Sequence, residues 1–110
     1  MPANLLADDV PKALVEEQVD LLLQRLGARL ERIVSTGQAT PEGQWLEQDH
    51  EEWVLLLAGA ARLTLEGEAP ASLGPGDCRL IPPGRRHRVD WTSTDPPAVW
   101  LALHLGGAPS

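Results

Sequence analysis

The sequence predicts a single all-β domain, either a sandwich or a closed barrel, with one α-helix at its N-terminus. Short apolar runs separated by glycine and proline fill the chain from residue 29 onward, which is typical of many short strands joined by turns. Before them, apolar residues recur at three- and four-residue spacing, which is typical of an amphipathic helix. A length of 110 residues fits one domain.

The expected helix covers residues 11–26. Gly27 follows it directly, and glycine commonly ends a helix. Asp8 and Asp9 precede it, and aspartate favours a helix start. The apolar stripe of the helix consists of Leu14, Val15, Val19, Leu22, Leu23 and Leu26.

Six strand candidates follow the helix, and glycine- or proline-containing turns separate them. They cover residues 29–35, 53–58, 61–66, 79–81, 87–91 and 99–105. The expected organisation is therefore one domain in three parts. These parts are a helical segment packed on the barrel (1–28), the barrel itself (29–105) and a flexible tail (106–110).

Side-chain alternation assigns the faces of the strand over residues 87–91. His87, Val89 and Trp91 share one face, because successive side chains of a strand point to opposite sides. The apolar members of this set should point into the barrel. His87 is then carried inward with them.

The strand that starts at Glu52 is apolar on both faces. Val54 shares the face of Glu52, and Trp53 and Leu55 lie on the other face. A strand of this kind has to be covered on both sides. The N-terminal helix and a second subunit are both candidate covers, and we expect a homodimer.

Charge and composition exclude several classes of partner. The net charge is −7 and the isoelectric point is about 4.8, so nucleic acid and anionic membranes would be repelled. No apolar run reaches the roughly 20 residues of a membrane helix. The single cysteine, Cys78, cannot form an intrachain disulfide, and a reducing, cytoplasmic location is expected.

Residues 76–87 read Gly-Asp-Cys-Arg-Leu-Ile-Pro-Pro-Gly-Arg-Arg-His. Gly76 begins a tight turn into a strand, Pro82 ends that strand, and Gly84 permits the reversal that aims His87 inward. This spacing resembles the second motif of the cupin family, and Glu52 followed by Gly59 resembles the end of the first motif. The chain is similar to small single-domain bacterial cupins of uncharacterised activity. The resemblance implies the double-stranded β-helix of that family, a jelly-roll barrel.

The resemblance also implies a metal held by two histidines and a glutamate of the first motif and by the histidine of the second. Glu52 and His87 match two of these four ligands. The positions of the first-motif histidines fall on Gln48 and Leu46, or on Glu47 and Trp45, depending on the register. Glu52, His87 and Gln48 offer one imidazole and oxygen donors, which could hold a divalent ion (Mn, Fe, Ni or Zn) weakly but match a tight zinc or iron site poorly.

Two functions remain open. The chain could bind a small polar ligand through Gln48, Glu52 and His87, with Trp45 at the mouth of the barrel. Alternatively, it could be a metal-dependent enzyme of isomerase or dioxygenase type, with Glu52 and His87 as metal ligands and catalytic candidates. Glu52 or His50 would then move protons. The missing histidines favour the binding protein.

Overall fold

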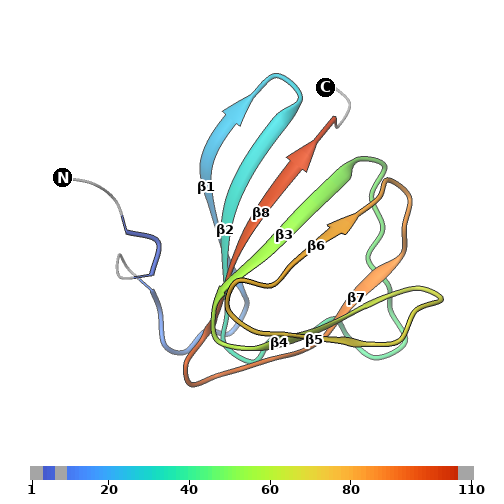
Figure 1. Cartoon of the computed structure of the whole chain (residues 1–110). Helices are drawn as coiled ribbons and strands as arrows, with labels where there is room; N and C mark the ends of the chain where they lie inside the picture. Colours follow the sequence, from blue (N-terminus) through green and yellow to red (C-terminus); the bar gives the residue numbers. More distant parts are fainter. Residues whose placement is uncertain (1–3, 7–9, 107–110) are drawn as a thin grey trace.

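The computed structural model describes residues 4–6 and 10–106. Within these residues the chain forms eight β-strands and no helix (Figure 1). The strands are β1 (Gln18–Arg25), β2 (Ala28–Ser35), β3 (Glu51–Ala58), β4 (Ala61–Leu65), β5 (Ala71–Leu73), β6 (Cys78–Ile81), β7 (His87–Thr92) and β8 (Ala98–Leu105). In the same part of the chain, no helix is long and apolar enough to cross a membrane.

The strands form two antiparallel sheets (Figure 1). The larger sheet has the order β1-β2-β8-β3-β6, and the smaller one has the order β5-β4-β7. The last strand, β8, thus lies in the middle of the larger sheet, paired with β2 on one side and β3 on the other. This is the jelly-roll, double-stranded β-helix architecture, and the predicted all-β fold class is confirmed.

The prediction of a helical segment over residues 1–28 is wrong. Gln18–Arg25 forms β1, which turns back on β2 through Leu26 and Gly27. Gly27 has a φ of 76°, a conformation that glycine adopts without strain and that a tight turn requires. Pairing with β2 satisfies the backbone groups on one side of β1, the edge strand of its sheet, and this gain outweighs the helical spacing of its leucines. Asp8 and Asp9 lie outside the described residues.

All six expected strands are present, and their ends agree to within two residues. The sequence reading missed β1 and the three-residue strand β5. Of the expected tail, residues 107–110 lie outside the described ranges. The amide of Gly106 donates to the carbonyl of Gly27, 2.8 Å away, so the end of β8 lies beside the β1–β2 turn.

The hydrophobic core lies between the two sheets. Leu56 and Trp100 from the larger sheet are buried with Leu63 and Leu65 from the smaller one. Trp91 is not part of this core, contrary to the expected alternation, because the pairing of β4 with β7 is irregular between Arg62 and Leu63. This bulge shifts the parity of β7, and Trp91 is 45% exposed.

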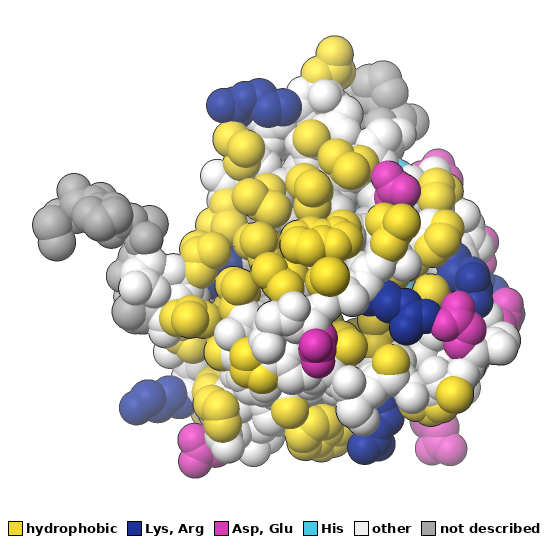
Figure 2. Space-filling view, in the orientation of Figure 1, with side chains coloured by type: hydrophobic (Ala, Val, Ile, Leu, Met, Phe, Trp, Pro, Cys, Tyr) yellow, Lys and Arg dark blue, Asp and Glu magenta, His cyan; other side chains and the backbone are white. Residues whose placement is uncertain are grey.

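The opposite side of the larger sheet carries a continuous group of hydrophobic side chains (Figure 2). We call this group the outer apolar face. Its members on β3, β6 and β8 are Trp53, Leu55, Leu80, Leu101 and Leu103. Leu80 is 49% exposed. The expected helical cover does not exist, and a second subunit remains a prediction.

Candidate ligand-binding site

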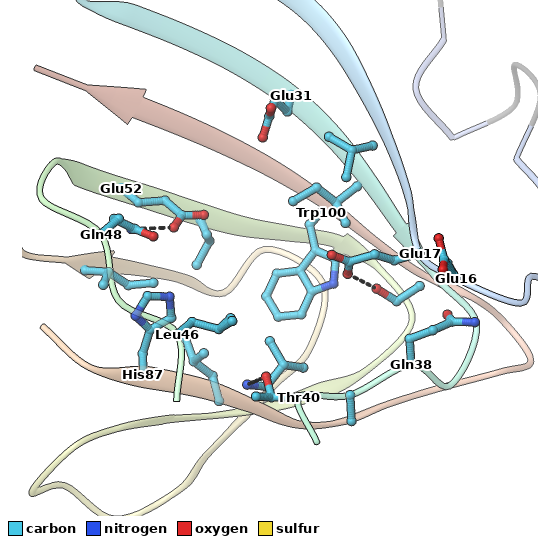
Figure 3. Close-up of a pocket in the computed structure, with 18 of the residues that line it drawn as sticks. Glu16, Glu17, Glu31, Gln38, Thr40, Leu46, Gln48, Glu52, His87 and Trp100 are labelled. Carbon is cyan, nitrogen blue, oxygen red and sulfur yellow. Dashed lines mark hydrogen bonds between the residues drawn. The ribbon is translucent and has the colours of Figure 1, made fainter. Parts of the chain in front are cut away.

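A cavity of about 650 Å³ opens inside the barrel. Its walls come from the segment before β1, from the loop between β2 and β3, and from every strand except β5 (Figure 3). Apolar side chains such as Val54, Leu63 and Ile81 line part of it. The cavity lining that the structure describes contains no lysine or arginine but five glutamates, namely Glu16, Glu17, Glu31, Glu47 and Glu52.

The backbone around the β6–β7 turn fixes the position of His87. Gly84, with a φ of 74°, makes the reversal, and its amide donates to the carbonyl of Gln48 at 2.7 Å. The backbone groups of His87 and Leu46 then exchange two hydrogen bonds, of 2.7 and 3.0 Å. The turn after β6 and the loop before β3 are thereby held together at one end of the barrel.

His87 presents one ring nitrogen to the cavity. The residue is 3% exposed and lines the cavity. Its Nδ1 lies 3.0 Å from the carbonyl oxygen of Arg85, so Nδ1 carries the proton and donates it to this bond. In the neutral ring Nε2 then has a lone pair, and it has no hydrogen-bond partner among the described residues. His87 is therefore a largely buried residue whose Nε2 opens on the cavity.

Glu52 and Gln48 lie together on the same wall. Nε2 of Gln48 donates to Oε1 of Glu52 at 2.8 Å (Figure 3). Glu52 is on the inner face of β3 and is 8% exposed. Its other oxygen, Oε2, lies 3.9 Å from Nε2 of His104, beyond hydrogen-bond distance. The structure thus brings Gln48, Glu52 and His87 to one cavity.

His104 joins this wall from β8. Its Nε2 donates to Oε1 of Glu31 at 3.0 Å, and Arg29 donates to the other oxygen of Glu31 at the same distance. His104 is thus a hydrogen-bonded strand residue that also lines the cavity. His50, whose side chain is 18% exposed, packs its ring against His104 and is not among the lining residues.

Glu17 approaches the cavity from the segment before β1. Its Oε2 accepts a hydrogen bond of 3.4 Å from the hydroxyl of Ser35. Partial burial raises the pKa of Glu17, and the charges of Glu52 and Glu31 raise it further, whereas the bond from Ser35 opposes the change. The charges of Glu52 and Glu31 thus act on Glu17 across the cavity.

Trp45 lies elsewhere than expected. The structure does not place it among the cavity-lining residues; the guanidinium carbon of Arg86 lies 5.6 Å from its ring centroid, as in a cation–π contact. The tryptophan that lines the cavity is Trp100. The sequence reading also missed Glu17 and Glu31. Glu31 alternates with Ile33 on a predicted strand and could have been found, but no local signal places Glu17 in the barrel.

The donor set does not fit the metal centre that the resemblance implies. Among the described residues, no three histidine, cysteine or acidic side chains are grouped so that they could hold a metal ion. The amide nitrogen of Gln48 is already engaged with Glu52. Metal sites of this kind need three or four donors at about 2.0–2.3 Å from one point.

Two facing antiparallel sheets around an internal cavity, with a histidine aimed inward after a glycine turn, define a small β-barrel protein of the double-stranded β-helix class. Residues 32–104 match the family described as Cupin domain. The chain belongs to the cupin family. No curated protein matches its sequence significantly.

Solved structures agree with this assignment. A protein from Ralstonia eutropha JMP134, provisionally named as a mannose-6-phosphate isomerase, is 43% identical, with 98% of this chain and 99% of that chain covered and a TM-score of 0.91. A cupin superfamily protein from Desulfitobacterium hafniense DCB-2 is 17% identical (94% and 90% covered, TM-score 0.76). An RmlC-like cupin from Methanocaldococcus jannaschii is 15% identical (87% and 85% covered, TM-score 0.68). The last two share the fold alone.

Proposed function

We propose that this cupin binds a small polar ligand inside its barrel. The observation that carries the proposal is the free Nε2 of His87, a 3% exposed residue that opens on a cavity of about 650 Å³. Cavities of roughly 300–1,000 Å³ are typical of small-molecule sites. No buried side-chain nitrogen or oxygen of the described residues lacks a partner, so Nε2 of His87 opens on the cavity, where a ligand donor can replace water.

The polar groups come from both sheets, with His87 on β7 of the smaller sheet and Glu52 on β3 of the larger one. Nε2 of His87 accepts a hydrogen bond from a ligand hydroxyl or amine, and Glu52 accepts a second one. The side-chain oxygen of Gln48 offers a third acceptor, because its nitrogen is bonded to Glu52. Val54 and Ile81 supply the apolar contacts. This arrangement orients a ligand that carries several donors.

The binding proposal is tested by screening small polar metabolites for thermal stabilisation of the protein. A hit should bind at least about tenfold more weakly to Gln48→Ala and His87→Ala. Gln44→Ala is the matched control, since Gln44 is exposed and lies outside the cavity lining. Hits that bind equally to all variants, or the absence of any hit, would refute the proposal.

The second candidate is an isomerase, favoured by the provisional name of the 43% identical Ralstonia protein. A sugar phosphate, however, needs cationic or backbone donors around its phosphate. The described lining contains five glutamates and no lysine or arginine, which argues against that substrate here. Elemental analysis of protein purified without affinity tag or chelator separates the candidates. A near-stoichiometric ion that disappears in His87→Ala would favour the metal enzyme, and a failure to bind added metal would exclude it.

We also propose that the protein is a cytoplasmic homodimer that pairs through the outer apolar face. A lone cysteine supports a reducing compartment. A single apolar patch on a sheet can pair with its own copy about a twofold axis, the commonest symmetry of soluble oligomers. Such pairing would cover Trp53, Leu55 and Leu80.

A further inference from the structure

We propose that the ligand of this cavity is a small organic cation, held between the carboxylates of Glu17 and Glu52 against the indole of Trp100. The inference rests on the proposed binding function and names the chemical class of the ligand. Three observations support it: the charge of the cavity, the aromatic side chain within it, and the unpartnered nitrogen of His87.

The negative charge of the cavity is only partly balanced by the protein. Glu31 is bonded to the guanidinium of Arg29 and to the ring of His104. Among residues 4–6 and 10–106, Glu17 has only the hydroxyl of Ser35, and Glu52 has the neutral amide of Gln48. No lysine or arginine of the described lining offsets the last two. Within this part of the chain, two carboxylates therefore face the cavity without a cationic partner in hydrogen-bond contact.

The two carboxylates differ in depth, since Glu52 is 8% exposed and Glu17 is exposed on the cavity lining. Burial and the charges of its neighbours raise the pKa of Glu17, which shows that its ionised form is disfavoured where it lies. A cation placed between Glu17 and Glu52 would favour both ionised forms. An anion in the same place would add to the repulsion. The cavity therefore discriminates between ligands by the sign of their charge.

Trp100 provides the surface on which such a cation would rest. The residue is 5% exposed and lines the cavity, and its indole lies between the carboxylates of Glu52 and Glu17 in Figure 3. Tryptophan is the side chain that best attracts a cation to its ring face. Carboxylates beside an indole form an environment suited to an alkylated or primary ammonium group.

The size of the site favours an organic cation over a metal ion. Among the described residues, no three candidate donors are grouped closely enough for one ion, whereas a cavity of about 650 Å³ accommodates a molecule. Nδ1 of His87 is engaged with the carbonyl of Arg85, and Nε2 of the neutral ring is free to accept. It would take a hydrogen bond from a hydroxyl or N–H of the same ligand. Different walls of the cavity would thus bind the cationic group and the polar substituent of the ligand.

The test compares ligands that have the same shape but different charge. Binding of choline and of its neutral isostere 3,3-dimethyl-1-butanol is measured by calorimetry or by ligand-observed NMR, with ethanolamine as a smaller cation and mannose 6-phosphate as an anion. Choline should bind at least about tenfold more tightly than the isostere. Glu17→Gln should reduce choline affinity about tenfold and leave the isostere unaffected.

Glu66→Gln makes the same change outside the cavity, where Glu66 pairs with Arg86, and it should leave choline binding unchanged. If the isostere binds as tightly as choline, or if Glu17→Gln leaves choline affinity intact, the cation proposal is wrong. If neutral or anionic compounds bind in a His87-dependent manner and neither cation binds, the binding function stands and the cation inference falls. If nothing of any charge binds, both are wrong.

Discussion

The rings of His50 and His104 are joined directly, with Nε2 of His50 lying 2.8 Å from Nδ1 of His104. Nε2 of His104 donates to Glu31 at 3.0 Å; when the His104 ring is neutral, its Nδ1 is the acceptor and His50 the donor. The two rings meet edge to face, with centroids 5.0 Å apart. A directed line of hydrogen bonds therefore runs from His50 to a carboxylate of the cavity.

The two histidines should differ in their contribution to stability. His104→Ala removes both hydrogen bonds and takes one donor from Glu31, whereas His50→Ala removes only the outer bond. We expect His104→Ala to lower the free energy of unfolding by about 1–3 kcal/mol, and His50→Ala by about half as much. Urea denaturation of both variants at neutral pH measures the difference. Equal losses would show that the inner bond to Glu31 contributes nothing.

Asp20 holds the buried guanidinium of Arg32, which is 6% exposed. Nε and one terminal nitrogen of Arg32 donate to Oδ2 of Asp20 at 2.9 and 2.7 Å, and these bonds lower the pKa of Asp20 below its ordinary 3.8. We expect Asp20→Asn to cost about 1 kcal/mol at neutral pH, a modest figure because solvent screens the partly exposed carboxylate.

The loss of unfolding free energy in Asp20→Asn should become smaller as the pH falls. A lowered folded-state pKa contributes stability that is fully present above the ordinary value of 3.8 and is lost as the pH falls through the folded-state pKa. The unfolding free energies of variant and wild type should therefore converge in acid. Asp95→Asn, at an exposed turn, is the control. A difference that persists unchanged in acid would contradict this interpretation.

The effect of Glu17 on stability should depend on pH with the opposite sign to that of Asp20. Its pKa is raised above the ordinary 4.5, so its ionisation destabilises the ligand-free fold above the folded-state value and has no effect below 4.5. Glu17→Gln should therefore raise the melting temperature at neutral pH, and this gain should vanish as the pH falls below 4.5. Thermal unfolding at several pH values measures it, with the exposed Glu42→Gln as control. A variant less stable than wild type at neutral pH would show that the carboxylate is favoured where it lies.

A charge on the outer apolar face should separate the predicted dimer. Leu80 is 49% exposed in the single chain, so Leu80→Glu should leave the monomer folded while it places two carboxylates in the shared interface. Light scattering should report a dimer for the wild type and a monomer for this variant. Leu26→Glu at the β1–β2 turn, where Leu26 is 92% exposed, is the matched control. If the wild type is a monomer at micromolar concentration, the dimer prediction is wrong.

The barrel could be predicted because its turns are determined by residues that lie close together in the sequence. The turns before and after β6 contain Gly76, Pro82 and Gly84. The alternation of side chains predicted that Glu52 and His87 lie on inner faces, and both are buried. Such signals act within a few residues. They do not require knowledge of which strands pair.

Features that depend on pairing could not be predicted in the same way. The leucines around β1 satisfy a helical and an extended spacing equally, and only the partner strand decides between them. The bulge opposite Arg62 and Leu63 turns Trp91 outward. No residue type in the sequence indicates this bulge. Glu17 reaches the cavity through the path of an irregular segment, so its position follows from the tertiary fold alone.

The cavity wall is built from two stretches of chain, one inside and one before the region that matches the cupin family. The match to the cupin family begins at residue 32, whereas Glu17 and Glu31 belong to the hairpin and segment that precede it. The conserved-fold portion supplies the barrel, His87 and Glu52. With the proposed cation site, an exchange of residues 10–27 for the equivalent arm of another small cupin would replace Glu17 and leave the strands that carry His87 and Glu52 unchanged. The N-terminal arm would thus set the charge preference of the pocket separately from the barrel.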